Sequence, residues 1–243
     1  METFFETNAD KNCHLLVAPT PAYMLADKLP ANAQLFDAAG CFDTVDERFG
    51  DAFIDTRPLL HEDGSNYYRT DHHWTTEGAL NAYEVWCAAT DHTVREWTLE
   101  QVSHSFRGTL YSQVMLPHSE YDTISIAPGA EVVSVDCDGE VRDSLYDLSA
   151  LEEKDHYKIF MGGNYAKVVI ETGADTGRDL LLIKDSFANS FVPFLTREYD
   201  TITLVDLRHC REEIQTLADN CSDILVLYEL TNFAADKNLF KLN

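Results

Sequence analysis

Leu180-Leu181-Leu182-Ile183-Lys184-Asp185-Ser186 is the segment of this chain that says most about its architecture. A short, uninterrupted apolar run is typical of a strand that is covered on both faces of a parallel sheet. Further strands are predicted at 201–205 and 224–228, and helical segments between the strands at 187–199, where Pro193 should kink or break the helix, and at 211–219. Strands that alternate with helices in this way predict βαβ units with right-handed crossovers.

The N-terminal part of the chain repeats this alternation. Apolar runs and helical periodicity predict strands at 14–18 and 52–54, and helices at 22–28, 42–49 and 75–89. Thr75 suits the N-cap of the last helix, and Glu77 lies in its first turn, where the helix dipole favours an acid.

Residues 97–179 have a different character. Short β-like runs at 123–126, 132–135 and 167–170 alternate with Gly, Asp and Pro turns. We therefore expect a single α/β domain over residues 1–243, with a mostly β insertion at about 97–179.

The charge of the chain limits its partners. Eighteen basic and 42 acidic residues give a formal net charge of −24. A nucleic-acid-binding protein needs a basic stripe, and the sequence contains none, so nucleic acid is not an expected partner. Anionic membranes and polyphosphates should also be repelled at long range. The acidity is better explained by solubility, or by a neutral or cationic substrate.

Several sequence signals are absent. The six cysteines include no CxxC pair, which argues against a zinc ribbon or a thioredoxin-type site. No run approaches the roughly 20 apolar residues of a membrane span. The acidic segment Met1–Glu6 lacks the basic and apolar regions of a signal peptide. We expect a soluble chain as given, from which an N-terminal anchor is missing.

Ser186 is the candidate nucleophile. In an open parallel sheet, ligands bind beyond the carboxyl ends of the strands. Ser186 directly follows a predicted strand and opens the next helix, so its hydroxyl should be exposed there, and backbone N–H groups nearby could hold an oxyanion. Serine at such a place is also a common N-cap, so this residue alone favours the capping role.

Asp71 and His73 are the candidates for the rest of a triad. In an extended segment, residues i and i+2 point to the same side, so the Asp71 carboxylate could orient the His73 imidazole. His72 would then project to the opposite side. One alternative is that Asp71 forms an Asx turn that caps the following helix. Another is a metal site at 71–73, but adjacent histidines rarely bind one ion, so no metal is predicted.

Four further residues are candidates for binding the substrate or an oxyanion. Asn189 offers an amide close to Ser186, and Asn232 follows the third parallel strand. Gly163 lies in a Gly-Gly-Asn segment that could bring backbone N–H groups or an amide to an oxyanion, and Arg107 lies among aromatic residues, as in a sugar-binding wall. The structural alternatives are a surface amide, a loop cap, a hairpin turn and a turn with packed aromatics.

The segments Tyr67-Tyr68-Arg69-Thr70-Asp71-His72-His73-Trp74-Thr75 and Lys184-Asp185-Ser186-Phe187-Ala188-Asn189-Ser190-Phe191 resemble the bacterial DHHW protein family. That family is similar to the SGNH-like O-acetyltransferases of exopolysaccharide assembly, such as those that act on alginate. The resemblance implies a flavodoxin-like, SGNH-hydrolase-type three-layer α/β/α core with a parallel sheet. By position, it implies that Ser186 is the nucleophile, His73 the base and Asp71 the residue that orients the base. Lys184 stands where the usual Gly-Asp-Ser motif has glycine.

Together, the residues and the resemblance predict a serine esterase or O-acetyltransferase that acts on a cell-envelope or extracellular glycan. It would use a Ser-His-Asp triad and an acyl-enzyme, without a cofactor. Its expected partners are a glycan or another acetylated small substrate, and other envelope polysaccharide-assembly proteins, in an extracytoplasmic location. The alternative is a non-catalytic glycan-binding or envelope-assembly protein on the same fold. The oligomeric state and the disulfide state stay open.

Overall fold

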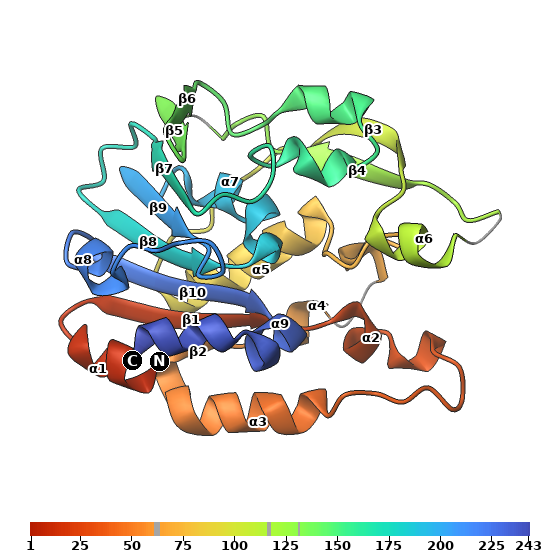
Figure 1. Ribbon diagram of the computed structural model, residues 1–243, viewed down its shortest axis with the longest axis horizontal. Coiled ribbons are helices and arrows are strands. Elements are labelled where there is room, and N and C mark those ends of the chain that lie inside the picture. Colours follow the sequence, from red (N-terminus) through yellow and green to blue (C-terminus); the bar gives the residue numbers. More distant parts are fainter. Residues whose placement is uncertain (61–63, 116–117, 131) are drawn as a thin grey trace.

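The computed structural model describes residues 1–60, 64–115, 118–130 and 132–243, which form one eight-stranded sheet and a separate pair of strands (Figure 1). The order in the large sheet is β2-β1-β10-β8-β9-β7-β5-β6, and β3 pairs with β4. The strands are β1 (Asn12–Ala18), β2 (Phe53–Ile54), β3 (Glu100–Phe106), β4 (Asp122–Ile126), β5 (Ser134–Cys137), β6 (Glu140–Arg142), β7 (Lys167–Glu171), β8 (Asp179–Lys184), β9 (Thr201–Val205) and β10 (Asp223–Glu229).

Five neighbouring strands of the large sheet, β2, β1, β10, β8 and β9, run parallel. The strands β7, β5 and β6 extend it in antiparallel fashion. The prediction of an α/β protein with a largely parallel sheet is therefore confirmed. The carboxyl ends of β1, β10 and β8 lie at one edge, because Ala18 pairs with Glu229 and Leu227 with Lys184. We call this the carboxyl edge.

The helices surround this sheet. The α-helices are α1 (Glu2–Thr7), α2 (Pro21–Met24), α3 (Ala38–Phe49), α4 (Arg57–Leu60), α5 (Thr76–Ala89), α6 (Thr109–Val114), α7 (Val192–Leu195), α8 (Ile214–Ala218) and α9 (Leu230–Ala235). Short 3-10 helices are η1 (Ala26–Lys28), η2 (Gly50–Ala52), η3 (Gly64–Asn66), η4 (Leu148–Glu152), η5 (His156–Ile159), η6 (Ser186–Ser190) and η7 (Lys237–Leu242). No helix in the described ranges is both long and apolar enough to span a membrane.

The central strand β8 is buried on both faces, as its apolar run predicts. Leu180 and Leu182 belong to a hydrophobic cluster with α5 and α7, whereas Leu181 and Ile183 belong to a second cluster with α1, α3, α8 and α9. Alternation of side chains along a strand produces this division. Each fully buried aliphatic side chain contributes about 1.5–3 kcal/mol, so β8 contributes strongly to both layers.

The helix predicted at 187–199 is not formed. The chain instead makes the 3-10 turn η6, followed by the single α-helical turn α7. Pro193 lies in the first turn of α7. This is the position at which a missing N–H costs nothing, and one at which proline starts a helix instead of continuing one. The nucleophile candidate therefore lies in a tight turn and not on a long helix.

The predicted insertion at 97–179 supplies two kinds of structure. The strands β3 and β4 form the separate antiparallel pair, whereas β5, β6 and β7 extend the large sheet beyond β9. The helix α5 matches the sequence prediction, with the Thr75 hydroxyl accepting a hydrogen bond from the Gly78 N–H at 3.1 Å. All six cysteines are described, and all are free thiols.

Candidate active site

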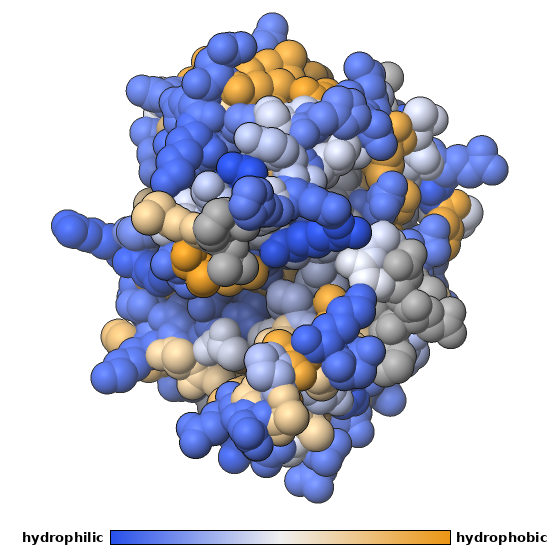
Figure 2. Space-filling view, turned by 90° about the vertical axis from the view of Figure 1, so that its right-hand side faces the viewer, coloured by the Kyte–Doolittle hydropathy of each residue, from blue (hydrophilic) through white to orange (hydrophobic). Residues whose placement is uncertain are grey.

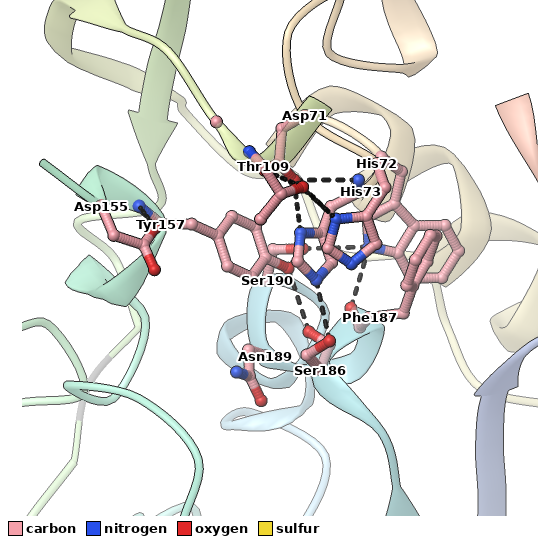
Figure 3. A network of polar contacts seen from close by, with 12 residues as sticks. Asp71, His72, His73, Thr109, Asp155, Tyr157, Ser186, Phe187, Asn189 and Ser190 are labelled. Atoms are coloured by element: carbon pink, nitrogen blue, oxygen red, sulfur yellow. Dashed lines mark hydrogen bonds and ion pairs between the residues drawn. The ribbon is translucent and has the colours of Figure 1, made fainter. Parts of the chain in front are cut away.

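Two segments that are remote in the sequence meet at the carboxyl edge. Ser186 is separated from the end of β8 by Asp185 alone and begins η6, and the segment that precedes α5 carries His73 to it. His73 Nε2 lies 2.8 Å from Ser186 Oγ, which is hydrogen-bond distance (Figure 3). Ser186 is partly exposed, whereas the His73 residue is only 4% exposed.

Asp71 completes a continuous chain of hydrogen bonds. Its Oδ1 lies 2.5 Å from His73 Nδ1 and also accepts the His73 backbone N–H at 3.0 Å. The second contact is an Asx turn, and residues 71–73 form a bend and not an extended strand. The strand geometry expected from the i, i+2 spacing is therefore wrong. The Asx turn predicted as the alternative is present, but Thr75 is the N-cap of α5, and the contact between Asp71 Oδ1 and His73 Nδ1 orients the imidazole.

The expected position of His72 is also wrong. Because the backbone bends, its ring does not project to the opposite side but lies against His73, with 3.9 Å between the ring centroids. Its Nδ1 lies 2.7 Å from Thr109 Oγ1, and its side chain is 40% exposed. His73, and not His72, contacts Ser186.

The residues Gly108 and Thr109 complete the surroundings of Asp71 and were not singled out from the sequence. Thr109 donates its backbone N–H to Asp71 Oδ2 at 2.8 Å and its hydroxyl to the same oxygen at 3.1 Å. A Cβ on Gly108 would lie 2.1 Å from that oxygen, so only glycine permits this approach. The Gly-Thr pair 37 positions after the motif has no sequence signature that connects it with Asp71.

The Asp122 side chain fixes the chain just before the motif. Its carboxylate accepts the backbone N–H groups of Arg69 and Thr70 at 2.9 and 2.7 Å, and the Thr70 hydroxyl at 2.5 Å. Asp122 is the first residue of β4, so the separate strand pair anchors the segment that carries the imidazole.

The electrostatics suit a general base. Burial alone would raise the pKa of Asp71, which is 1% exposed, but the hydrogen bonds from His73 and Thr109 hold it well below its usual range. Burial lowers the pKa of His73, and Asp71 offsets part of that effect. His73 is therefore neutral at physiological pH and can accept a proton, while the ionised Asp71 would stabilise the resulting imidazolium.

Aromatic residues hold His73 and the turn η6, which begins at Ser186, together. The Tyr157 ring stacks on the His73 ring at 3.8 Å and 7°, and its hydroxyl donates to the Ser186 carbonyl at 3.1 Å. The indole N–H of Trp74 donates to the Phe187 carbonyl at 2.9 Å. Tyr157 thus joins the His73 ring to η6, and Trp74, the residue after His73, is itself bonded to η6. These contacts limit the relative motion of the imidazole and the Ser186 hydroxyl.

Asp185 and Asn232 also hold the turn η6, through hydrogen bonds to the Asp185 carboxylate. Asp185 accepts the Phe187 N–H at 2.9 Å, the Glu229 N–H at 2.9 Å and the Asn232 side-chain amide at 2.8 Å. Burial raises the pKa of Asp185. The amide of Asn232, a candidate oxyanion donor from the sequence, is thus engaged in holding the residue next to Ser186.

Lys184 connects Asn189 with the Gly163 turn. The Lys184 side chain is buried, its Nζ donates to Asn189 Oδ1 at 2.8 Å, and burial lowers its pKa to about 8. The Asn189 amide then donates to Asn164 Oδ1 at 3.3 Å. Ser186 and Asn189 lie three residues apart in η6, where side chains eclipse one another. Asn189 is therefore connected, next to Ser186, with the turn that contains Gly163 and Asn164.

Arg107 lies outside this group of contacts. Its guanidinium packs between Tyr111 and Tyr121, at 4.5 and 4.0 Å from the ring centroids. It also donates to the Tyr111 hydroxyl at 3.2 Å and to the Ser119 carbonyl at 2.8 Å. These contacts stabilise the segment that carries Gly108 and Thr109. They match the structural alternative for Arg107, a turn with packed aromatic residues.

Asp71, His72 and His73 offer ligand atoms within 4.8 Å of one another, as a metal site would. However, both ring nitrogens of His73 and the Nδ1 of His72 are already engaged with protein partners. An ion at this place would have to displace these hydrogen bonds. The donor set therefore fits a hydrogen-bonded triad better than a metal centre.

Comparison with known proteins identifies the family. A model described as "DHHW protein" matches residues 38–205. The chain belongs to the DHHW family. No functionally curated protein shows detectable sequence similarity to it.

Solved structures share the fold of this DHHW protein. A DHHW family protein from Eubacterium siraeum superimposes with a TM-score of 0.79 at 23% identity, covering 96% of this chain and 82% of that one. Bacillus cereus PatB1 with a sulfonyl adduct gives 0.79 at 20% identity, with coverages of 98% and 87%. The O-acetyltransferase domain of Pseudomonas putida AlgJ gives 0.60 at 12% identity, with coverages of 100% and 82%.

Proposed function

We propose that this DHHW protein is a serine esterase or O-acetyltransferase of cell-envelope or extracellular glycans. The observation that carries the proposal is the hydrogen-bond chain from Asp71 through His73 to Ser186, with contacts of 2.5 and 2.8 Å. The fold shared with the AlgJ O-acetyltransferase domain agrees with it. We also propose that the chain forms one domain with an SGNH-like three-layer arrangement and an inserted β region.

In the first half-reaction, Ser186 Oγ attacks the carbonyl carbon of an acetyl ester while its proton moves to His73 Nε2. The tetrahedral intermediate then collapses, the bond to the alcohol leaving group breaks, and His73 returns the proton to that alcohol. The acetyl group remains on Ser186 as an ester. Asp71 stabilises the imidazolium while the proton is held.

In the second half-reaction, a water molecule or a sugar hydroxyl attacks the acetyl-serine. His73 takes the proton of the attacking group and passes it to Ser186 as the acyl bond breaks. Water gives acetate, and a sugar hydroxyl gives a new acetyl ester. Which acceptor prevails depends on which group is held next to His73.

The oxyanion of both tetrahedral intermediates needs hydrogen-bond donors. No hydrogen bond between described residues engages the backbone N–H of Ser186, so this group is available. We propose that it acts with the amides of the Asn189–Asn164 turn pair, with Gly163 allowing the turn. Each such donor contributes about 3–4 kcal/mol to transition-state stabilisation in related chemistry.

The proposal includes a glycan or another acetylated small molecule as substrate and an extracytoplasmic location near other polysaccharide-assembly proteins. The net charge of −24 opposes nucleic acid as a partner. It favours a neutral or cationic glycan over a strongly anionic one.

The test is the replacement Ser186→Ala, measured as p-nitrophenyl acetate hydrolysis and as covalent labelling. PatB1 carries a sulfonyl adduct in one structure, so a sulfonyl fluoride is a suitable probe besides a phosphonate. We expect the variant to lose turnover and labelling, and the exposed Ser149→Ala control to keep both. Unchanged hydrolysis in Ser186→Ala would remove the enzymatic proposal. Glycan binding by an inert wild-type protein would instead support the non-catalytic alternative.

A further inference from the structure

A cavity of about 620 Å³ opens at the carboxyl edge beside the triad. Its lining includes His72, Pro21, Leu25, Leu110, Thr231 and Asn232. Figure 2 views the molecule from this side, where hydrophobic and hydrophilic side chains surround a central hollow. Asn232 connects the cavity wall to Asp185 and therefore to the turn η6. The cavity has the size of an ordinary small-ligand site.

His72 is the residue through which this cavity reaches the triad. Its ring lies against the His73 ring, with a centroid separation of 3.9 Å, and it also lines the cavity. None of the steps of the proposed reaction uses it. It is therefore a polar group between the cavity and the triad whose role is unassigned.

The hydrogen bonds of Thr109 determine what His72 can offer to a ligand. The single hydroxyl proton of Thr109 is donated to the Asp71 carboxylate, which can only accept. Thr109 Oγ1 must then accept from His72 Nδ1, 2.7 Å away, so that in the neutral form of this imidazole the proton lies on Nδ1. The Nε2 of His72 is left with a lone pair as a hydrogen-bond acceptor.

An acceptor nitrogen beside the catalytic base has a clear chemical complement. The hydroxyl that attacks the acyl-enzyme must donate to His73 Nε2, and a ligand group bound at His72 Nε2 is a second donor. The 3.9 Å separation of the two ring centroids keeps these two donors near each other. Two hydroxyls on adjacent carbons supply such a pair. The cavity combines apolar walls with the charged side chains of Lys28, Arg69 and Glu229, and this mixture suits a sugar, which has both apolar faces and hydroxyl edges.

We propose that His72 recognises the acyl acceptor by accepting a hydrogen bond from the hydroxyl adjacent to the attacking one, so that the site selects vicinal diols of carbohydrates over water and simple alcohols. This inference rests on the proposed function. It makes His72 a specificity-determining residue that favours transfer over hydrolysis.

The experiment measures partition of the acetyl group with p-nitrophenyl acetate as donor. Acetyl transfer to trans-1,2-cyclohexanediol, to cyclohexanol and to methyl β-glucoside is quantified by mass spectrometry and divided by the acetate released. For the wild-type chain, we expect a ratio for the diol and the glucoside at least about tenfold above that for cyclohexanol, which corresponds to about 1.4 kcal/mol.

Two substitutions separate recognition from packing. His72→Asn keeps an amide donor near the position of Nδ1 and removes Nε2, so the preference for the diol should fall about tenfold. His72→Gln places a carbonyl acceptor near the position of Nε2, and it should restore the preference to within about threefold of wild type. The exposed His104→Asn, on β3, is the matched control and should change nothing.

The outcomes distinguish the two proposals. If Ser186→Ala still hydrolyses the donor, the proposed function fails. If Ser186 is required but the wild-type chain shows no preference for the diol, the role of His72 is wrong. Equal losses of preference in His72→Asn and His72→Gln would assign the residue to packing and would also overturn the inference.

Discussion

His73 and His92 lie at opposite edges of the main sheet, and each packs on an aromatic ring. His73 stacks on Tyr157 at 3.8 Å, and His92 stacks on Trp86 at 4.3 Å. His92 lies beside a 260 Å³ cavity whose lining includes the first residues of β1 and β10, Asn12 and Asp223. Burial lowers the pKa of both imidazoles.

The partners of the two rings differ. His73 Nδ1 contacts a carboxylate and its Nε2 a serine hydroxyl, whereas His92 Nε2 accepts from the guanidinium of Arg178 at 2.7 Å. Arg178 lowers the pKa of His92 further, while Asp71 opposes the lowering at His73. Glu198 and Asp223 also raise the pKa of His92, but of these two rings only His73 has a carboxylate in hydrogen-bond contact. A carboxylate in direct contact stabilises the imidazolium that forms when the ring accepts a proton.

The largest loss of activity is expected when the His73 imidazole is removed. His73→Ala should lower kcat/KM for p-nitrophenyl acetate by about 10³-fold, since general acid–base catalysis contributes about 10²–10⁴-fold. His92→Ala should stay within about twofold of wild type, with folding checked by circular dichroism. Comparable losses in both variants would mean that the carboxylate partner does not distinguish the two histidines.

A smaller loss of activity is expected when the Asp71 carboxylate is displaced. Gly108 has an ordinary backbone conformation, with φ −86°, so alanine is tolerated there except for the contact of its Cβ with Asp71. Gly108→Ala should lower kcat by about 10²-fold, because it displaces the residue that orients the base. In the control Gly40→Ala, the new Cβ meets only the movable Asp37 side chain. If Gly108→Ala keeps wild-type kcat, Asp71 does not need its observed position.

The smallest effect concerns the buried ammonium beside the turn η6. The folded-state pKa of Lys184, about 8, lies below its ordinary value of 10.5. The unfolded chain therefore binds more protons between these values, and this lysine makes the free energy of unfolding rise as the pH increases through that window. Lys184→Met should remove the rise, which is about 1–3 kcal/mol.

Urea denaturation at pH 7 and at pH 10.5 measures this difference between wild type and Lys184→Met. The exposed Lys154→Met corrects for the loss of a lysine charge elsewhere on the surface. A wild-type minus Lys184→Met difference that stays constant over this range would show that Lys184 keeps its ordinary proton affinity in the folded chain.

The local patterns that predict the fold are those with a simple periodicity. The apolar run of β8 predicts a strand covered on both faces, and the division of its side chains between two clusters confirms it. Thr75 predicts the start of α5 because a capping hydroxyl acts within one turn. The helix at 187–199 fails because Pro193 starts a helix more readily than it continues one.

Local sequence patterns predict only part of the geometry of the candidate site. The motif segments predict that Ser186, His73 and Asp71 meet, and the structure brings them within hydrogen-bond distance, while their catalytic role stays a prediction. The strand alternation used to place Asp71 and His73 does not apply, because an Asx turn bends the backbone there. The same bend places His72 against His73 instead of on the opposite side.

The sequence by itself determined the alternation of strands and helices and the kinds of side chain available for acyl transfer, since periodicity and residue chemistry are local properties. Only the tertiary structure decided that Thr109 and Gly108 enclose Asp71, that Lys184 binds Asn189 and that Asn232 is engaged with Asp185. Most of these contacts join residues far apart in the chain at one sheet edge. Their geometry depends on how the strands and the connecting segments pack against one another, and no short segment of sequence encodes that packing.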